Sequence, residues 1–384
     1  MSRAELPAAL PETVDVQTLR RWLQDGVRVE VLDVRPARDR ADWSIPGSVH
    51  LDAHDALWAR DPAALDGAPI RADGMVVTVC GAGRTSLLAS RLLRSRGVNA
   101  ASLDGGMKAW SGAWNLAEVP VGVDGLRIVQ VRRTGKGCLS YVVGAGAEAT
   151  VIDASVDPEV YLGIARQHGW VITTLVETHV HADHLSRAHA LRRITSGRLI
   201  VPAQERVSFP HTAADNGYTW EAGAAAARMT ALHTPGHTGE SMCILLAGRW
   251  LFTGDTLFLD SVGRPDLEGG AAEAAGHARD LFRSLARIRS LSKDTVILPA
   301  HTSAPIPFDQ VPCARTLGEV ESRTPLLAAD EASFVQSILA GLPPAPANFS
   351  RIVEINERGE IPADDQGVEL EAGANRCAVG VAPV

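Results

Sequence analysis

The chain has 384 residues, 46% hydrophobic and 21% charged, and this length indicates two or three domains with apolar cores. A formal net charge of −8 argues against a nucleic-acid partner, because neutralising phosphates requires a basic surface. The first residues lack a secretory signal and no run reaches membrane-spanning length, so we expect a cytoplasmic protein with no membrane partner. Five scattered cysteines argue against a disulfide framework.

Residues 14–114 alternate short β-branched runs with helical patterns. The segments 29–34, 75–80 and 100–104 are predicted strands, and 85–95 is a predicted helix. Such alternation predicts a small α/β domain, a parallel sheet flanked by helices, which we assign to residues 1–117.

Cys80 follows one of these strands and precedes a short loop that opens a helix. The residues of this predicted sulfur-anion loop are Gly81, Ala82, Gly83, Arg84 and Thr85. Backbone N–H groups and the positive helix end would stabilise a thiolate and then a bound persulfide, and Arg84 adds a charge. We therefore predict that Cys80 is a catalytic residue.

Residues 32–51, the Cys80 loop and residues 103–110 together resemble the rhodanese family of sulfurtransferases. The resemblance implies that Cys80 takes a sulfane sulfur from a donor such as thiosulfate and passes it to a thiol or cyanide. Asp33 and Arg35 match the Asp-x-Arg segment of the family, and we expect an ion pair there. The loop is short for a phosphatase on this scaffold, which favours sulfur over phosphate.

The stretch 116–125 contains proline and glycine without helical periodicity, and we predict that residues 118–125 link the first domain to a second domain spanning 126–384. Predicted strands at 126–133, 138–146 and 149–154 follow closely, as in an antiparallel meander, and helices and strands then alternate. After residue 341 the sequence is rich in proline, glycine and alanine and predicts no clear element.

Seven potential metal ligands follow predicted strands of this second domain. They are His179, His181, Asp183, His184, His237, Asp255 and His301. Imidazole and carboxylate ligands suit zinc, iron or manganese, and we expect these side chains to meet at strand ends. Gly236 and Gly254 would let the backbone turn sharply beside two of them.

The motifs around these ligands, in this order and at these intervals, resemble the metallo-β-lactamase superfamily from about residue 126 to the C-terminus. The resemblance implies a four-layer αβ/βα sandwich with the metals at one edge of its two sheets. Residues 254–267 are similar to persulfide dioxygenases and differ from glyoxalase II. Within them, Arg264 could bind an anionic thiol carrier such as glutathione, and Asp266 could accept from its ammonium group or orient Arg264.

The similarity to persulfide dioxygenases implies one Fe(II) per domain, held by the residues that match theirs, His179, His237 and Asp255. Two imidazoles and one carboxylate leave positions open for O2 and the substrate sulfur. The four remaining ligand candidates, His181, Asp183, His184 and His301, would then orient the ligands or hold a second metal. The same seven residues also suit a dinuclear zinc hydrolase, in which a bridging hydroxide attacks a thioester, so two zinc ions are an open alternative.

Two sulfur-handling domains on one chain favour an enzyme of sulfide oxidation. We expect oxidation of a small thiol persulfide, foremost glutathione persulfide, by O2 to sulfite, coupled to sulfur transfer by Cys80 between thiosulfate and thiols. The alternatives are a glyoxalase II-like zinc thioester hydrolase with a rhodanese appendage, and a persulfide carrier or sensor without turnover. A homodimer through the metal domain would resemble the family.

Overall fold

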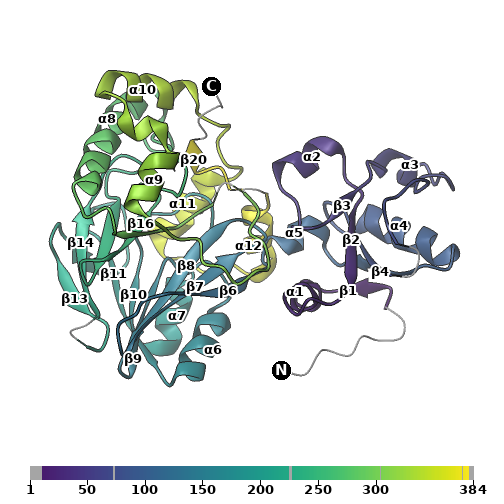
Figure 1. Ribbon diagram of the computed structural model, residues 1–384, viewed down its shortest axis with the longest axis horizontal. Coiled ribbons are helices and arrows are strands. Elements are labelled where there is room, and N and C mark those ends of the chain that lie inside the picture. The colour runs from purple at the N-terminus through teal and green to yellow at the C-terminus, as the bar shows by residue number, and fades with distance from the viewer. Residues whose placement is uncertain (1–10, 72–73, 225–226, 303, 374, 380–384) are drawn as a thin grey trace.

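The computed structural model of the chain describes residues 11–71, 74–224, 227–302, 304–373 and 375–379, which form two bodies of unequal size (Figure 1). The smaller, first body contains a five-stranded sheet in the order β1-β5-β4-β2-β3, with every pairing parallel. Its strands are β1 (Thr13–Val14), β2 (Val29–Asp33), β3 (Val49–His50), β4 (Met75–Val79) and β5 (Asn99–Leu103). The predicted parallel sheet is confirmed.

Helices cover both faces of this sheet because its strands are apolar on both sides. Val77 and Val79 pack toward one core, whereas Val76 packs toward the other. The helices are α1 (Val16–Gln24), α2 (Ala37–Asp42), α3 (His54–Trp58), α4 (Arg84–Ser95) and α5 (Gly106–Trp110). The ends of β2, β4 and β5 lie at one edge of the sheet, which places Arg35, Cys80 and Gly105 near one another.

The second body contains two larger sheets. The first has the order β12-β11-β10-β9-β8-β7-β6 and the second β13-β14-β15-β16-β18-β19. The strands of the first are β6 (Asn115–Val119), β7 (Leu126–Arg133), β8 (Cys138–Ala145), β9 (Glu148–Ile152), β10 (Val171–Val176), β11 (Arg198–Pro202) and β12 (Thr212–Ala214). Those of the second are β13 (Thr219–Glu221), β14 (Arg228–His233), β15 (Met242–Leu246), β16 (Trp250–Gly254), β18 (Val296–Pro299) and β19 (Arg315–Thr316). The predicted meander of β7, β8 and β9 is antiparallel, as expected.

Alternating side chains of these strands build four layers. Tyr141 and Val143 of β8 pack between the two sheets, whereas Val142 points outward beneath α6 (Pro158–His168) and α7 (Ala188–Thr195). The outer face of the second sheet packs against α8 (Gly270–Arg289), α9 (Leu317–Arg323) and α10 (Glu331–Ala340). The αβ/βα sandwich expected from the sequence is therefore present.

The boundary between the two bodies lies earlier than predicted. Strand β6 pairs antiparallel with β7 and forms the edge of the larger sheet. Residues 115–117, predicted in the first domain, and residues 118–119, predicted in the linker, therefore belong to the second body. The chain crosses between the bodies at 111–114, just after α5. Proline and glycine at 120–125 instead form the turn between β6 and β7, and such residues are as typical of a hairpin turn as of a linker.

The C-terminal segment also differs from its prediction, because it contains helices α11 (Phe349–Arg358) and α12 (Asp364–Glu371). Ile352 and Ile355, three positions apart, pack α11 on Leu185, which follows the predicted metal ligands His181, Asp183 and His184. Strand β20 (Ala378–Val379) then pairs with β17 (Val262–Gly263). The segment therefore wraps back over the site.

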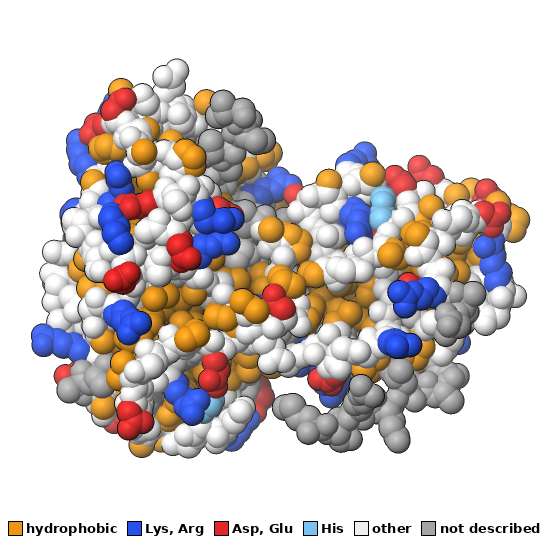
Figure 2. Space-filling view, in the orientation of Figure 1, with side chains coloured by type: hydrophobic (Ala, Val, Ile, Leu, Met, Phe, Trp, Pro, Cys, Tyr) orange, Lys and Arg blue, Asp and Glu red, His pale blue; other side chains and the backbone are white. Residues whose placement is uncertain are grey.

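All five cysteines are free. In the described part of the chain, no helix is both long enough and apolar enough to cross a membrane. The two bodies touch along a waist on which hydrophobic side chains gather (Figure 2), and there α12 of the second body lies against α5 of the first.

Candidate functional sites

The predicted metal ligands do follow strand ends. His179 lies after β10, His237 after β14, Asp255 directly after β16 and His301 after β18, and all four are buried. Gly254, at the corner before Asp255, has a φ of 50°, and a Cβ atom there would lie 2.7 Å from the Thr178 hydroxyl. The sharp turn predicted at this glycine is thus required by both backbone angle and space.

Three of these residues present unpartnered polar atoms to one another. The Nε2 atoms of His179 and His237 lie 3.8 and 3.5 Å from Asp255 Oδ2. None of these three buried atoms has a hydrogen-bond partner among the described residues. Three converging donor atoms buried without partners fit a metal ion, because a buried polar group otherwise finds a hydrogen bond.

The other ring nitrogen of His179 and of His237, Nδ1, is fixed by a hydrogen bond. The Thr178 hydroxyl donates to Asp153 (2.9 Å) and therefore accepts from His179 Nδ1 (2.9 Å). His237 Nδ1 donates to the carbonyl oxygen of Arg264 (2.7 Å). A ring that donates from Nδ1 keeps the lone pair on Nε2 available, so both imidazoles are in the tautomer that binds a metal.

His181 does not join this group. Its Nε2 atom lies 2.8 Å from Glu177 Oε2 and 3.3 Å from Asp153 Oδ1. Burial alone would lower the pKa of His181, but these two carboxylates raise it well above the usual value. A ring nitrogen held between two carboxylates donates a proton to them, so His181 braces the loop in this arrangement.

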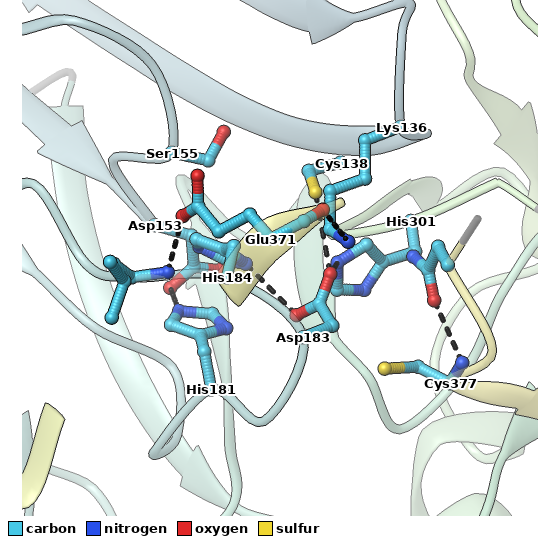
Figure 3. Close-up of polar contacts among 12 residues, drawn as sticks. Lys136, Cys138, Asp153, Ser155, His181, Asp183, His184, His301, Glu371 and Cys377 are labelled. Atoms are coloured by element: carbon cyan, nitrogen blue, oxygen red, sulfur yellow. Dashed lines mark hydrogen bonds and ion pairs between the residues drawn. The ribbon is translucent and has the colours of Figure 1, made fainter. Parts of the chain in front are cut away.

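Asp183, His184 and His301 form a second group (Figure 3). Asp183 accepts from His184 Nδ1 (2.9 Å) and lies 3.0 Å from His301 Nε2, and His301 Nδ1 reaches Asp255 Oδ1 at 2.5 Å. Cys138, which the sequence reading did not select, donates from its sulfur to Asp183 at 3.4 Å. His301 therefore connects the two groups through a carboxylate on each side.

The charges of the two groups follow from burial and proximity. Burial and the neighbouring His181 hold the pKa of His179 well below its usual value, so the ring stays neutral. Burial alone would raise the pKa of Asp255, but His301, His179 and His237 keep it below its usual value. Burial would likewise lower the pKa of His301, and the carboxylates of Asp183 and Asp255 raise it instead.

Arg264 does not have the predicted role in binding a thiol carrier. Its side chain is 1% exposed, and all five of its N–H groups are used inside the protein. They donate to both oxygens of Asp266 and to the carbonyl oxygens of Pro343, Pro344 and Arg376. The Arg264 side chain, paired with Asp266, thus connects the C-terminal segment to the strand-end residues through hydrogen bonds. The Arg264 carbonyl oxygen orients His237.

Two residues that the sequence reading missed hold the ligand loop from the C-terminal helices. Glu371 accepts from the Leu185 amide (2.6 Å), Arg133 (2.9 Å) and Arg187 (3.1 Å). Asn356 donates to the carbonyl oxygens of His181 and His184. Burial would raise the pKa of Glu371, but Arg133 and Arg187 lower it from 4.5 to about 2.

We expect Glu371→Gln to lower the free energy of unfolding by roughly 3 kcal/mol at neutral pH, because it removes one partner of a buried ion pair. The folded-state pKa lies below the unfolded value, so this contribution is complete above about pH 4.5 and is lost as the pH falls toward about 2. Urea unfolding of both proteins at several pH values measures it. Glu369→Gln, on the same helix but 67% exposed, is the matched control, and an equal loss in both variants would contradict the assignment.

The Cys80 loop is built as predicted in the first body. Cys80 is 3% exposed and its sulfur accepts from the Ser86 hydroxyl at 3.3 Å, while Gly83, with a φ of 84°, precedes α4. Gly81, Ala82 and Arg84 are exposed and Thr85 is buried. The expected ion pair is also present, since Arg35 lies 2.7 Å from Asp33.

Gly106 packs closely against the backbone of the Cys80 loop. A Cβ atom at this position would lie 2.3 Å from the Cys80 carbonyl oxygen and 2.7 Å from the Gly83 nitrogen. We expect Gly106→Ala to reduce the predicted sulfur transfer from thiosulfate on the order of 10²-fold by displacing the loop. Steady-state kinetics with cyanide as acceptor measure the loss. Gly97→Ala carries a similar positive φ in open space and should keep most of the activity. Unchanged kinetics of the Gly106 variant would contradict this reading.

Two family models match the chain. The metallo-beta-lactamase superfamily matches residues 133–301, and a rhodanese-like domain matches residues 15–113. A hydroxyacylglutathione hydrolase from Methylococcus capsulatus is 33% identical over 204 residues, which cover 51% of this chain and 75% of that relative. The chain belongs to the metallo-beta-lactamase superfamily. Its first body is a rhodanese-like domain, so the predicted fusion of the two families is confirmed.

Other similar proteins agree on the fold of the metallo-beta-lactamase domain. A hydroxyacylglutathione hydrolase from Rhodopseudomonas palustris is 29% identical over 257 residues, covering 65% of this chain and 93% of that protein. A metallo-beta-lactamase structure from Staphylococcus aureus has a TM-score of 0.58 at 25% identity, covering 63% of this chain and 76% of that one. The structure of ETHE1 from Myxococcus xanthus has a TM-score of 0.53 at 24% identity, covering 60% and 98%, and shows the fold alone.

Proposed function

We propose that the chain is a persulfide dioxygenase joined to a thiosulfate sulfurtransferase. Its metallo-beta-lactamase domain would oxidise a small thiol persulfide, foremost glutathione persulfide, with O2, and its Cys80 would move sulfane sulfur between thiosulfate and thiols. The observation that carries the proposal is the group of three unpartnered atoms, His179 Nε2, His237 Nε2 and Asp255 Oδ2.

Two imidazoles and one carboxylate on one side of an ion are the ligand set of non-haem Fe(II) oxygenases. An Fe(II) ion bound there would activate O2 toward the persulfide sulfur. The overall reaction balances as one persulfide, one O2 and one water giving one thiol, one sulfite and two protons. Glu177 and Asp153 hold the Nε2 atom of His181, so only its unpartnered Nδ1 atom could bind a metal, and His181 is not one of the three residues whose ligand atoms converge.

The surrounding residues of the chain hold this set in place. Thr178 and the Arg264 carbonyl fix the two imidazoles, and His301 fixes one oxygen of Asp255, leaving the other oxygen for the ion. We assign His181, Asp183, His184 and His301 to positioning the ligands.

Cys80 supports the second activity. Its thiolate would attack the outer sulfur of thiosulfate, and the sulfur–sulfur bond would break with sulfite as the leaving group. An acceptor thiolate would then attack the bound sulfane sulfur and release Cys80 as a thiolate. The Ser86 hydroxyl and the loop amides at the start of α4 would stabilise the negative charge in both states.

A zinc-dependent thioester hydrolase is the second candidate. The similar hydroxyacylglutathione hydrolases favour it, and so does the close grouping of Asp183, His184 and His301 with Cys138, which could hold another ion. Such an enzyme would bind a metal through the unpartnered Nδ1 atom of His181, whose ring centre lies 4.3 Å from that of His179. The homodimer and the cytoplasmic location stay predictions.

Assaying the protein in iron-loaded and in zinc-loaded form separates the two candidates. We expect the iron form to oxidise glutathione persulfide and the zinc form to be inactive on it, with slow thioester hydrolysis in both. Rapid hydrolysis of a glutathione thioester by the zinc form, without persulfide oxidation by the iron form, would establish the hydrolase instead.

A further inference from the structure

A cavity of about 160 Å³ lies between the two domains, beside the Cys80 loop. Gly81, Met107 and Lys108 line it from the rhodanese-like domain, and Gly135, Ala372 and Gly373 line it from the metallo-beta-lactamase domain. The amides of Met107 and Lys108 donate to the carbonyl oxygens of Cys80 and Gly81, at 2.8 and 3.0 Å. One wall of the cavity is therefore fixed directly to the loop that carries the reactive sulfur.

The opposite wall is fixed to the metal site. Lys136, next to Gly135, donates to the carbonyl oxygens of Glu371 and Gly373, and the Glu371 carboxylate holds the Leu185 amide of the ligand loop. A Cβ atom on Gly135 would lie 1.7 Å from the Trp110 carbonyl oxygen, so the two backbones are in close contact at the edge of the cavity. The cavity is thus a built feature of the domain contact.

The lining combines apolar surface with charges of both signs. Trp43, Met107 and Ala372 offer apolar contact, while Asp42 and Lys108 form ion pairs across the domain contact with Arg376 and Glu369. The ammonium group of a ligand can bind the carboxylate of such a pair, and the carboxylate of the ligand can bind its cation. The volume lies below that of a drug-sized pocket, which suits an amino-acid-sized compound or one end of a short peptide.

We infer that this interdomain cavity binds the acceptor of Cys80, and that the acceptor is a small zwitterionic thiol of the cysteine or glutathione type. The inference rests on the proposed sulfurtransferase function. The bound thiolate attacks the sulfane sulfur on Cys80, a new sulfur–sulfur bond forms, and the bond to Cys80 breaks to leave its thiolate. The acceptor departs as a persulfide, the substrate class proposed for the metal site, and the metallo-beta-lactamase domain selects it by forming half of the binding site.

Filling the cavity from the second domain tests this inference. In the full-length Ala372→Leu protein we expect kcat/KM for glutathione and for cysteine to fall at least about tenfold, with thiosulfate as donor, because the larger side chain occupies the acceptor volume. Transfer to cyanide, which needs little space, should stay within about twofold and shows that the Cys80 loop is intact. Ala332→Leu, on an exposed position of α10, is the matched control.

The Lys108→Gln variant tests the charge of the acceptor. It should raise the KM for glutathione by roughly threefold and leave the KM for mercaptoethanol, an uncharged thiol, unchanged. Unchanged glutathione kinetics in Ala372→Leu would overturn the inference, and so would an equal fall with glutathione and cyanide. Oxygen uptake with preformed glutathione persulfide is measured on the same samples. Its absence in the wild-type protein would refute the dioxygenase proposal while leaving the acceptor site standing.

Discussion

Replacing His237 by alanine is expected to abolish the proposed persulfide oxidation and the proposed binding of iron. The substitution removes one of three converging ligand atoms, and several kcal/mol of transition-state stabilisation by the metal is lost with it, which is on the order of 10³-fold in kcat/KM or more. Iron content and oxygen uptake of the purified variant measure the effect. His54→Ala, in the rhodanese-like domain, is the control.

The metal content of a His181→Gln variant, compared with that of the His237 variant, distinguishes a ligand from a positioning residue. Because His181 contacts Glu177 and Asp153 rather than the converging atoms, we expect this variant to keep about one iron per chain and to lose roughly 10- to 100-fold in activity. Equal loss of metal from the His181 and His237 variants would instead mean that His181 is a ligand, as a dinuclear hydrolase requires.

Replacing Cys80 by serine is expected to abolish sulfur transfer from thiosulfate, by at least about 10³-fold, because a serine hydroxyl is not deprotonated at neutral pH and cannot form the persulfide. Oxygen uptake with preformed glutathione persulfide should stay at the wild-type rate. Uptake with thiosulfate plus glutathione should disappear, because no persulfide is then made.

Cys313→Ser is the matched control for this substitution, since Cys313 is free and belongs neither to the Cys80 loop nor to a group of potential metal ligands. Wild-type oxygen uptake from thiosulfate and glutathione in the Cys80 variant would show that the domains do not work in sequence. Loss of uptake with preformed persulfide in that variant would place Cys80 in the oxidation step itself.

The positions of the ligands could be predicted because each follows an apolar strand, and strands of one sheet end at a common edge. This reasoning located His179, His237, Asp255 and His301 correctly at strand ends. It could not separate His181 from His179, because the deciding partner Asp153 belongs to a neighbouring strand end and comes close only in the fold.

Contacts from distant parts of the chain explain the remaining differences. Arg264 was predicted to face a ligand, but its partners Pro343, Pro344 and Arg376 lie about a hundred residues later, in a segment whose composition predicted no structure. The residues of strand β6 were divided between the predicted first domain and the predicted linker, because a five-residue edge strand carries little periodic signal. A clearer signal existed for α11, where Ile352 and Ile355 have helical spacing.

The stoichiometry of oxygen uptake tests the central claim most directly. With the iron-loaded protein and glutathione persulfide in an oxygen electrode, we expect one O2 consumed for each sulfite formed, with the activity absent from the His237→Ala protein and present in the Cys80→Ser protein. A wild-type protein that retains two zinc ions, consumes no oxygen and hydrolyses a glutathione thioester would contradict it.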